Sequence, residues 1–197
     1  MQIFDCEQGS DEWFECRLGI PTASMFHTMM AGGQGKTRTD YLYKKAGEII
    51  TGELAEGFQG NVHTERGNEL EPQARELYEL QSGNQVEQCG FIRADYGAGY
   101  SPDGLVDGGL IEIKTKLPHL QIKVLLDDKV PTAHSKQIQG GLEIADKEWL
   151  DFISFWPGLP LFIKRVYRDE KLIKEIRQEI DRFNNDVQEI INKIEQM

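Results

Sequence analysis

Apolar residues recur along the chain with two different spacings, and the spacing changes from one segment to the next. Positions three or four residues apart predict helices, and this spacing covers residues 10–19, 22–30, 39–56, 65–83, 119–126, 132–144 and 169–197. Alternation at every second residue predicts strands, and it covers residues 85–94, 101–116, 149–157 and 161–166. This order predicts an α/β fold with a mixed central β-sheet flanked by helices and a long C-terminal helix.

Residues 101–116 form the most informative stretch, because their pattern predicts a β-hairpin. Asp107-Gly108-Gly109 supplies the residues of a tight turn, with apolar runs on both sides. On the second strand, Glu112 and Lys114 lie two residues apart and therefore share one face. With the strand 85–94, the hairpin predicts three consecutive antiparallel strands.

The same hairpin can bring a second acid to this face. Asp103 lies on the first strand between Pro102 and Gly104, residue types that often mark a strand end or bulge at a functional site. Two carboxylates bind hard divalent cations through oxygen, and a lysine can stand beside the attacking water. Half-buried strands also carry charge on one face, so the Glu-x-Lys pattern alone indicates little. Together the three residues match what metal-dependent phosphodiester cleavage needs.

A second informative block lies near the N-terminus. Ser10 is a good N-cap for a short helix that ends at Gly19, and a second helix begins at Thr22 or Ser24. Arg17 can be an ordinary surface ion pair. Alternatively its planar guanidinium clamps an anion, with Ser24 adding a hydroxyl and backbone donors at a helix start.

Composition constrains the partners and the compartment. The chain has 197 residues, a formal net charge of −11 and three cysteines, and its N-terminus lacks the pattern of a signal peptide. No apolar run is long enough to span a bilayer. We expect free thiols in a reducing cytosol. The acidic total argues against a nucleic-acid partner unless the basic residues gather on one surface.

These stretches resemble the lambda-exonuclease-like, YqaJ-type viral recombinase family of the PD-(D/E)xK nuclease superfamily. The resemblance is carried by the hairpin 101–116 and by the pattern Gly-x-x-x-Trp-x-x-x-Arg-Leu-Gly-x-x-Thr-Ala-Ser over residues 9–24. Residues 66–71 and 135–142 are similar to two further family segments. The resemblance implies a restriction-endonuclease-like core within one domain spanning 1–197. It divides that domain into phosphate-binding helices over 8–30, a catalytic core over 65–167 and a C-terminal helix over 169–197.

The resemblance also implies a role for each site residue. Asp103, Glu112 and the backbone carbonyl of Ile113 would hold Mg²⁺, in a two-metal arrangement for which Mn²⁺ can substitute. Lys114 would orient the attacking water. Gln137 would hydrogen-bond near that water, and Glu71 would support the metal or the water. Arg17 and Ser24 would clamp the 5′-phosphate, with Ser101 helping to hold it. Glu69 competes with Glu71, and His134 stands where the family often has an aromatic residue.

The implied function is a Mg²⁺-dependent 5′→3′ exonuclease on linear double-stranded DNA. Such an enzyme releases 5′ mononucleotides and leaves 3′ single strands for recombination by strand annealing. The implied assembly is a ring-shaped homotrimer around DNA, with a single-strand annealing protein as partner, no membrane, and a bacterial cytoplasm in a phage or prophage context. Two alternatives stay open: an endonuclease or junction resolvase on the same core, and a catalytically silent module that binds DNA ends.

Three further expectations concern segments outside the motifs. The glycine-rich stretch 31–40, with Lys36 and Arg38, predicts a flexible basic loop near DNA or, alternatively, a plain solvated loop. Residues 57–66 are the expected location of the strand-separating residue. In the helix 39–56 we expect Ile49 and Ile50 on the buried face and Lys45 near the other face. The C-terminal helix is long enough either to wrap the domain or to pack against a neighbouring subunit.

Overall fold

The computed structural model of the chain describes residues 1–31, 36–54 and 62–197. Their helices are α1 (Asp11–Cys16), α2 (Phe26–Met29), α3 (Lys36–Thr51), α4 (Val62–Ser82), α5 (Pro118–Asp127), α6 (Ser135–Ile144) and α7 (Glu170–Glu195), with short 3-10 helices η1 (Ala23–Met25) and η2 (Thr132–His134). Their strands are β1 (Gln2–Phe4), β2 (Phe91–Ala94), β3 (Ala98–Tyr100), β4 (Gly104–Val106), β5 (Gly109–Thr115), β6 (Trp149–Phe155) and β7 (Phe162–Tyr167).

The strands form two sheets. The smaller sheet has the order β1-β2-β3 and is antiparallel throughout. The larger sheet has the order β4-β5-β6-β7, in which β5 and β6 are parallel and the two outer pairs are antiparallel. Helices α5 and α6 lie in the crossover that parallel strands require. This mixed sheet with flanking helices confirms the predicted α/β fold.

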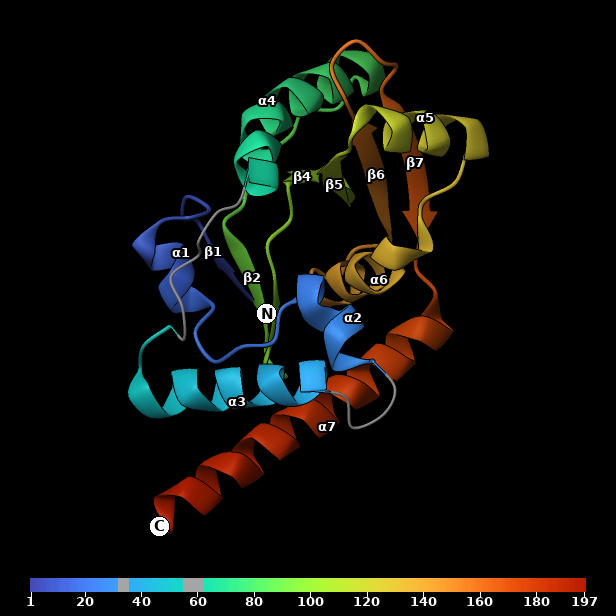
Figure 1. Cartoon of the computed structure of the whole chain (residues 1–197). Helices are drawn as coiled ribbons and strands as arrows, with labels where there is room; N and C mark the ends of the chain where they lie inside the picture. Colours follow the sequence, from blue (N-terminus) through green and yellow to red (C-terminus); the bar gives the residue numbers. More distant parts are fainter. Residues whose placement is uncertain (32–35, 55–61) are drawn as a thin grey trace.

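Helices cover both faces of the larger sheet (Figure 1). Side chains of α4, including Ala74 and Tyr78, pack with Ile111 and Ile113 of β5 on one face. The other face, which carries Leu110, packs in the main core with residues of α6. Because β5 is buried on both faces, a charged residue inside it needs partners within the protein. Glu112 is such a residue.

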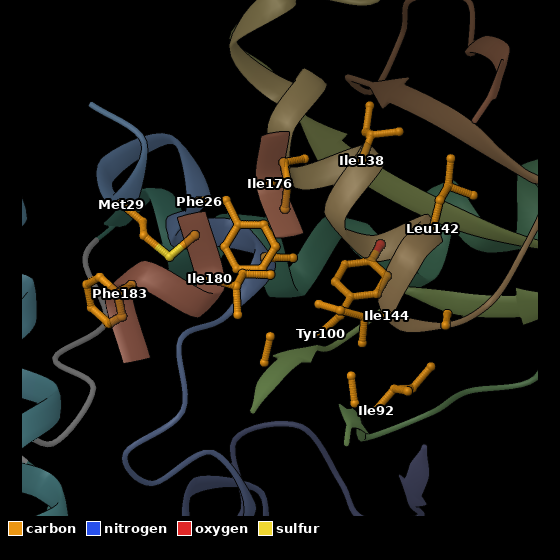
Figure 2. Close-up of a cluster of buried hydrophobic side chains, with 14 of the residues drawn as sticks. Phe26, Met29, Ile92, Tyr100, Ile138, Leu142, Ile144, Ile176, Ile180 and Phe183 are labelled. Atoms are coloured by element: carbon orange, nitrogen blue, oxygen red, sulfur yellow. The ribbon is translucent and has the colours of Figure 1, made fainter. Parts of the chain in front are cut away.

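The main core connects both sheets to α6 and α7 (Figure 2). Phe26 of α2, Tyr100 of β3 and Leu142 of α6 are fully or almost fully buried there. Ile176 and Ile180 of α7 point into the same cluster. The core therefore fixes β3, and with it the start of the segment that leads into the hairpin.

Local signals in the sequence begin several of these elements, and the Ser10 cap and the Gly108 turn are as predicted. The side chain of Ser10 accepts a hydrogen bond from the backbone N–H of Trp13 and caps α1. Asp169 caps α7 by accepting from the N–H groups of Lys171 and Leu172. Gly108, with φ of 76°, makes the turn between β4 and β5.

The prediction of three consecutive antiparallel strands is wrong, because these strands divide between the two sheets. Within 85–94 only Phe91–Ala94 forms a named strand, and Glu87 makes an isolated bridge to Leu105. β3 belongs to the smaller sheet, whereas β4 starts the larger one. Pro102 lies between them and has no N–H to donate to a ladder, so the pairing breaks at this point.

The predicted face of α3 is also partly wrong. Lys45 is buried, whereas Ile49 and Ile50 are 49% and 46% exposed. The Nζ of Lys45 donates to Oε2 of the buried Glu48 at 2.7 Å, which supplies the partner that a buried ammonium needs. The helix spans 36–51 instead of 39–56, and residues 55 and 56 lie outside the described part of the chain.

The two loop predictions have different outcomes. Arg38 lies in α3, not in a loop, and pairs with Glu179 and Asp186 of α7 at 2.9 Å each, so it joins two helices. Residues 57–61 of the expected strand-separating loop lie outside the described residues, and α4 already begins at Val62.

Helix α7 wraps the domain along α3 and α6 (Figure 1). Its apolar stripe is buried from Ile173 to Ile191, while Ile194 in the last turn is 47% exposed. Most of this helix therefore packs on its own domain, which is the first of the two alternatives predicted from the sequence. Among the described residues, none of the helices is both long and apolar enough to cross a bilayer.

Candidate active site

The hairpin brings Asp103 against β5. Asp103 lies directly before β4, and Gly104 is paired with Ile111 across the turn. The Oδ2 atom of Asp103 accepts a hydrogen bond from the backbone N–H of Ile113 at 2.5 Å. Asp103 is thereby held beside the segment that carries Glu112, as the sequence predicts.

Glu112 is the centre of the polar cluster and is 1% exposed. Its Oε1 accepts from the Nε2 of Gln137 at 2.6 Å and lies 2.5 Å from the Nζ of Lys114. Its Oε2 accepts from the hydroxyl of Tyr100 at 2.6 Å. Three neighbours from β3, β5 and α6 therefore fix this carboxylate, and two of them, Lys114 and Gln137, are predicted site residues.

Glu71 of α4 belongs to the same electrostatic cluster. Its Oε1 accepts from Arg75 at 2.5 Å, and Arg75 also donates to the backbone carbonyl of Asp103 at 3.3 Å. Glu71 also interacts electrostatically with Glu112 and Lys114. Glu69 is exposed. The geometry thus favours Glu71 over its competitor.

Crowding of charge shifts the pKa values of these groups. Burial, and then the charge of Glu112, raise the pKa of Asp103 well above its usual value, while Lys114 opposes the shift. Burial also raises the pKa of Glu71, against the effect of Arg75. Burial alone would lower the pKa of Lys114, but Glu112 and Asp103 outweigh it, so this pKa is raised. Without a cation, the cluster therefore resists full ionisation of its acids.

The donor set fits a hard divalent cation. In the described part of the chain, no group of three or more His, Cys, Asp or Glu side chains is arranged to hold a metal ion. Mg²⁺, however, is commonly bound through one or two carboxylates and keeps several waters. Asp103 and Glu112 would supply two carboxylates. Ile113, which lies between Glu112 and Lys114 in the chain, would supply a backbone carbonyl. A cation there would also relieve the repulsion that raises the pKa of Asp103.

Arg17 lies in a second polar cluster close to the hairpin. Its guanidinium stacks on Trp13, with its central carbon 3.8 Å from the ring centroid, and donates to Oγ of Ser101 at 2.9 Å. Trp13 donates to the same Oγ at 2.9 Å. Burial lowers the pKa of Arg17 to about 10, and none of the described ion pairs includes Arg17. A half-buried guanidinium that donates to a serine hydroxyl and makes no ion pair among the described residues is suited to an anionic ligand.

Ser24 is the predicted site residue that is not brought into direct contact with the others. It lies exposed in η1, where its Oγ is 3.3 Å from Oγ1 of Thr22. Thr22 forms an isolated bridge with Gly99, shortly before Ser101. The start of η1 is thus tied to the segment that carries Ser101, although Ser24 and Arg17 have no hydrogen bond to each other among the described residues.

Three residues of these clusters have no predicted role. Arg75 has a readable signal, because it lies four positions after Glu71 on one helix face. Trp13 is part of the N-terminal pattern, but nothing in that pattern indicates that it supports Arg17. In the sequence, Tyr100 looks like an ordinary core residue. The one signal of a further role is that a buried tyrosine hydroxyl needs a hydrogen-bond partner.

Comparisons with known proteins identify the family of the chain. The model of the YqaJ-like viral recombinase domain matches residues 12–148, which is more than half of the chain. The chain belongs to this family. The matched residues include both polar clusters described above. No curated protein sequence matches the chain significantly.

Solved structures extend the likeness to almost the whole chain. The alkaline exonuclease LHK-Exo from Laribacter hongkongensis is 34% identical, with a TM-score of 0.86 over 95% of this chain and 97% of that one. Its complex with dAMP gives a TM-score of 0.87 at the same identity and coverage. A phage-related exonuclease from Haemophilus somnus 129PT is 18% identical, with a TM-score of 0.67 over 89% and 96% of the chains, and shows the fold alone. Together the comparisons support a nuclease of the exonuclease and recombinase type.

Proposed function

We propose that the chain is a divalent-metal-dependent exonuclease that digests linear double-stranded DNA from 5′ ends. It releases 5′ mononucleotides and leaves 3′ single strands that serve recombination by annealing. The observation that carries the proposal is the convergence of Asp103, Glu112 and Lys114, with Arg17 hydrogen-bonded to Ser101 two residues before Asp103. LHK-Exo, a family relative of the same fold, is described as an alkaline exonuclease and is seen with dAMP.

Asp103, Glu112 and the carbonyl of Ile113 would hold the cation, and Mg²⁺ is the ion we assign, with Mn²⁺ as a substitute. When bound, the cations position the attacking and leaving oxygens and neutralise charge on the phosphate. Gln137 and Tyr100 hold the Glu112 carboxylate in place through its two oxygens. Glu71, held by Arg75, stands at the edge of the same site.

Lys114 acts on the water and the scissile phosphate. The neighbouring acids keep its ammonium protonated, so it donates hydrogen bonds and stabilises negative charge as the linkage breaks. Its Nζ lies 2.5 Å from Oε1 of Glu112, and this contact supports the proposed role. The lysine would orient the attacking water, and a cation held by Glu112 would share that carboxylate with the ammonium.

The Arg17 cluster sets the polarity of digestion. Arg17 and Ser101 bind the terminal 5′-phosphate, and Ser24 adds a hydroxyl at the nearby start of η1. Ser101 and Asp103 are separated by Pro102 alone, so their Cα atoms are at most about 7 Å apart. A strand whose terminal phosphate is clamped at Ser101 therefore presents a linkage close to that end to Asp103. Cleavage at this position removes one nucleotide at a time.

A ring-shaped homotrimer completes the proposal. Enclosed DNA stays bound between cuts, and the net charge of −11 then lies on the outer surface while basic residues line the channel. The partner that would use the 3′ strands is a single-strand annealing protein. Measurement of the mass in solution tests the assembly, since a monomer at working concentration would remove the ring.

Digestion of three forms of one plasmid tests the reaction type. We expect the linear form to be converted to mononucleotides in the presence of Mg²⁺, and the covalently closed circle to stay intact. Nicking of the closed circle would favour the endonuclease or resolvase. Binding of the linear form without any release of nucleotides would favour the silent end-binding module. The nicked circle reports whether a 5′ end inside a duplex is accepted.

A further inference from the structure

Strand β5 leads into a second lysine that the proposed active site does not use. Lys116 lies two residues after Lys114 and therefore on the same side of the extended chain. Its backbone N–H donates to the carbonyl of Phe155 at 3.1 Å, which continues the pairing with β6. Two residues of strand span about 7 Å, so the two side chains start close together.

The ammonium of Lys116 is held by a histidine. Its Nζ lies 3.2 Å from Nε2 of His134. Because an ammonium has only donors, Nε2 must accept, and the proton of the neutral ring belongs on Nδ1. Burial, and then the charges of Lys116 and Lys114, lower the pKa of His134 to about 4, so the ring is neutral at physiological pH. The ring also packs against Phe152, with centroids 5.3 Å apart.

Lys116 has no carboxylate within 4.0 Å among the described ion pairs, unlike Lys114 two residues before it. Other lysines, including the half-buried Lys136 and Lys147, also lack one, but the ammonium of Lys116 is held by His134. Burial and the neighbouring Lys114 lower its pKa, and no acid raises it. In a chain of net charge −11, a half-buried lysine held only by a neutral imidazole is an unusual arrangement.

The surface beside this lysine is hollowed. A cleft of about 450 Å³ is lined by Lys116 together with Lys123 and Lys129, and part of its wall is the apolar side chains of Leu120 and Val124. Lys123 is paired with Asp127 at 2.5 Å. The cleft thus begins at Lys116 and carries three lysines against one acid, Asp127, in its lining, which suits a polyanionic chain.

We propose that Lys116, held in place by His134, binds a backbone phosphate of the DNA strand next to the linkage being cut. The inference rests on the proposed function and adds a subsite to it. Lys116 makes the contact, and His134 is a positioning residue that directs its ammonium. The strand then runs from Lys114 over Lys116 into the cleft.

The test measures duplex binding as a function of salt, in a chelator so that no turnover occurs. Each lost phosphate contact on B-DNA flattens the slope of log K against log salt by about 0.9. We expect Lys116→Met to flatten the slope by this amount and to weaken binding equally for unrelated sequences. Lys123→Met removes one charge from the same cleft at a paired position and should leave the slope unchanged.

His134→Phe keeps an aromatic ring against Phe152 but removes the acceptor for Lys116. We expect it to weaken binding in the unmodified background and to have no further effect in the Lys116→Met background, which measures their coupling. An equal loss in both backgrounds would mean that His134 acts apart from Lys116, and would overturn its positioning role.

Failure of this inference can be told apart from failure of the proposed function. If the unmodified protein digests linear duplex DNA but Lys116→Met keeps the full salt slope, the subsite is wrong and the exonuclease stands. If the unmodified protein neither binds nor digests duplex DNA, both proposals are wrong. Thermal unfolding of each variant shows that it is folded, so that a changed slope reports binding.

Discussion

The Nζ of Lys114 lies 2.5 Å from Oε1 of Glu112, and the two residues are two positions apart on strand β5. This contact places the amine at the carboxylate that the proposed function assigns to the cation. Glu112 is 1% exposed and would be costly to bury without such partners. The acid and the lysine therefore form one electrostatic unit, and a change in either alters the other.

Replacement of Lys114 by methionine should abolish cleavage and spare DNA binding. The variant keeps the length of the side chain but loses the ammonium that orients the water and stabilises the phosphate. We expect the rate of nucleotide release to fall by about 10²–10⁴-fold. Release of labelled nucleotides measures the rate, and binding in a chelator is its companion measurement. The exposed Lys171 serves as a matched control, since Lys171→Met should leave the rate unchanged. Retained turnover in Lys114→Met would remove the lysine from the mechanism.

Replacement of Tyr100 by phenylalanine should weaken cation binding without disrupting the core. The ring stays packed in the cluster of Figure 2, but the hydrogen bond from its hydroxyl to Glu112 is lost. Loss of such an outer partner typically costs about 10–100-fold in metal affinity or activity. Titration of activity with Mg²⁺ measures this shift. An unchanged Mg²⁺ dependence would show that Tyr100 contributes only to packing.

Replacement of Arg17 by alanine should erase any preference for 5′-phosphorylated ends. In the unmodified protein, we expect duplexes with a 5′-phosphate to be digested faster than those with a 5′-hydroxyl, because the half-buried Arg17 makes no ion pair among the described residues and can bind the phosphate. Competition between the two substrates measures the preference. Arg93, exposed on β2, gives a control variant that should keep it. Equal digestion of both ends by the unmodified protein would refute the clamp.

Stabilisation by Mg²⁺ should grow with pH. The folded-state pKa of Asp103 is raised, so its contribution to stability is full below its unfolded pKa of about 3.9 and is lost as pH rises through the folded value. A cation needs the ionised acid and opposes this loss. The gain in unfolding temperature on adding Mg²⁺ should therefore be larger at pH 8 than at pH 5. Asp103→Asn should show a smaller gain that changes little with pH, and an equal gain at both values in the unmodified protein would contradict the assignment.

The sequence predicts the hairpin site well because a strand has a period of two. Once the turn at Gly108 is recognised, alternation alone places Glu112 and Lys114 on one face, and pairing across the turn brings Asp103 beside them. The residues that hold this site are harder to predict. Tyr100 comes from the other sheet and Arg75 from α4, so their contacts depend on tertiary packing that no local pattern encodes.

Helix α3 shows why a buried face can be misjudged. Counting apolar residues assigns Ile49 and Ile50 to the core, yet Lys45 and Glu48 are buried there as a pair. A pair of opposite charges three residues apart satisfies itself, and the backbone N–H of Gly19 completes the partners of Glu48. Arg38 is a similar case, since its acidic partners on α7 lie more than 140 residues away along the chain.

Digestion of a linear duplex labelled at one 5′ end or at one 3′ end tests the central claim most directly. With Mg²⁺, the account predicts immediate release of the 5′ label as a mononucleotide, while the 3′ label stays on a long single strand. Without a divalent cation, it predicts no release of either label. Release of the 3′ label first, or equal release in a chelator, would contradict the proposal that Asp103, Glu112 and Lys114 cut DNA from its 5′ end with a bound cation.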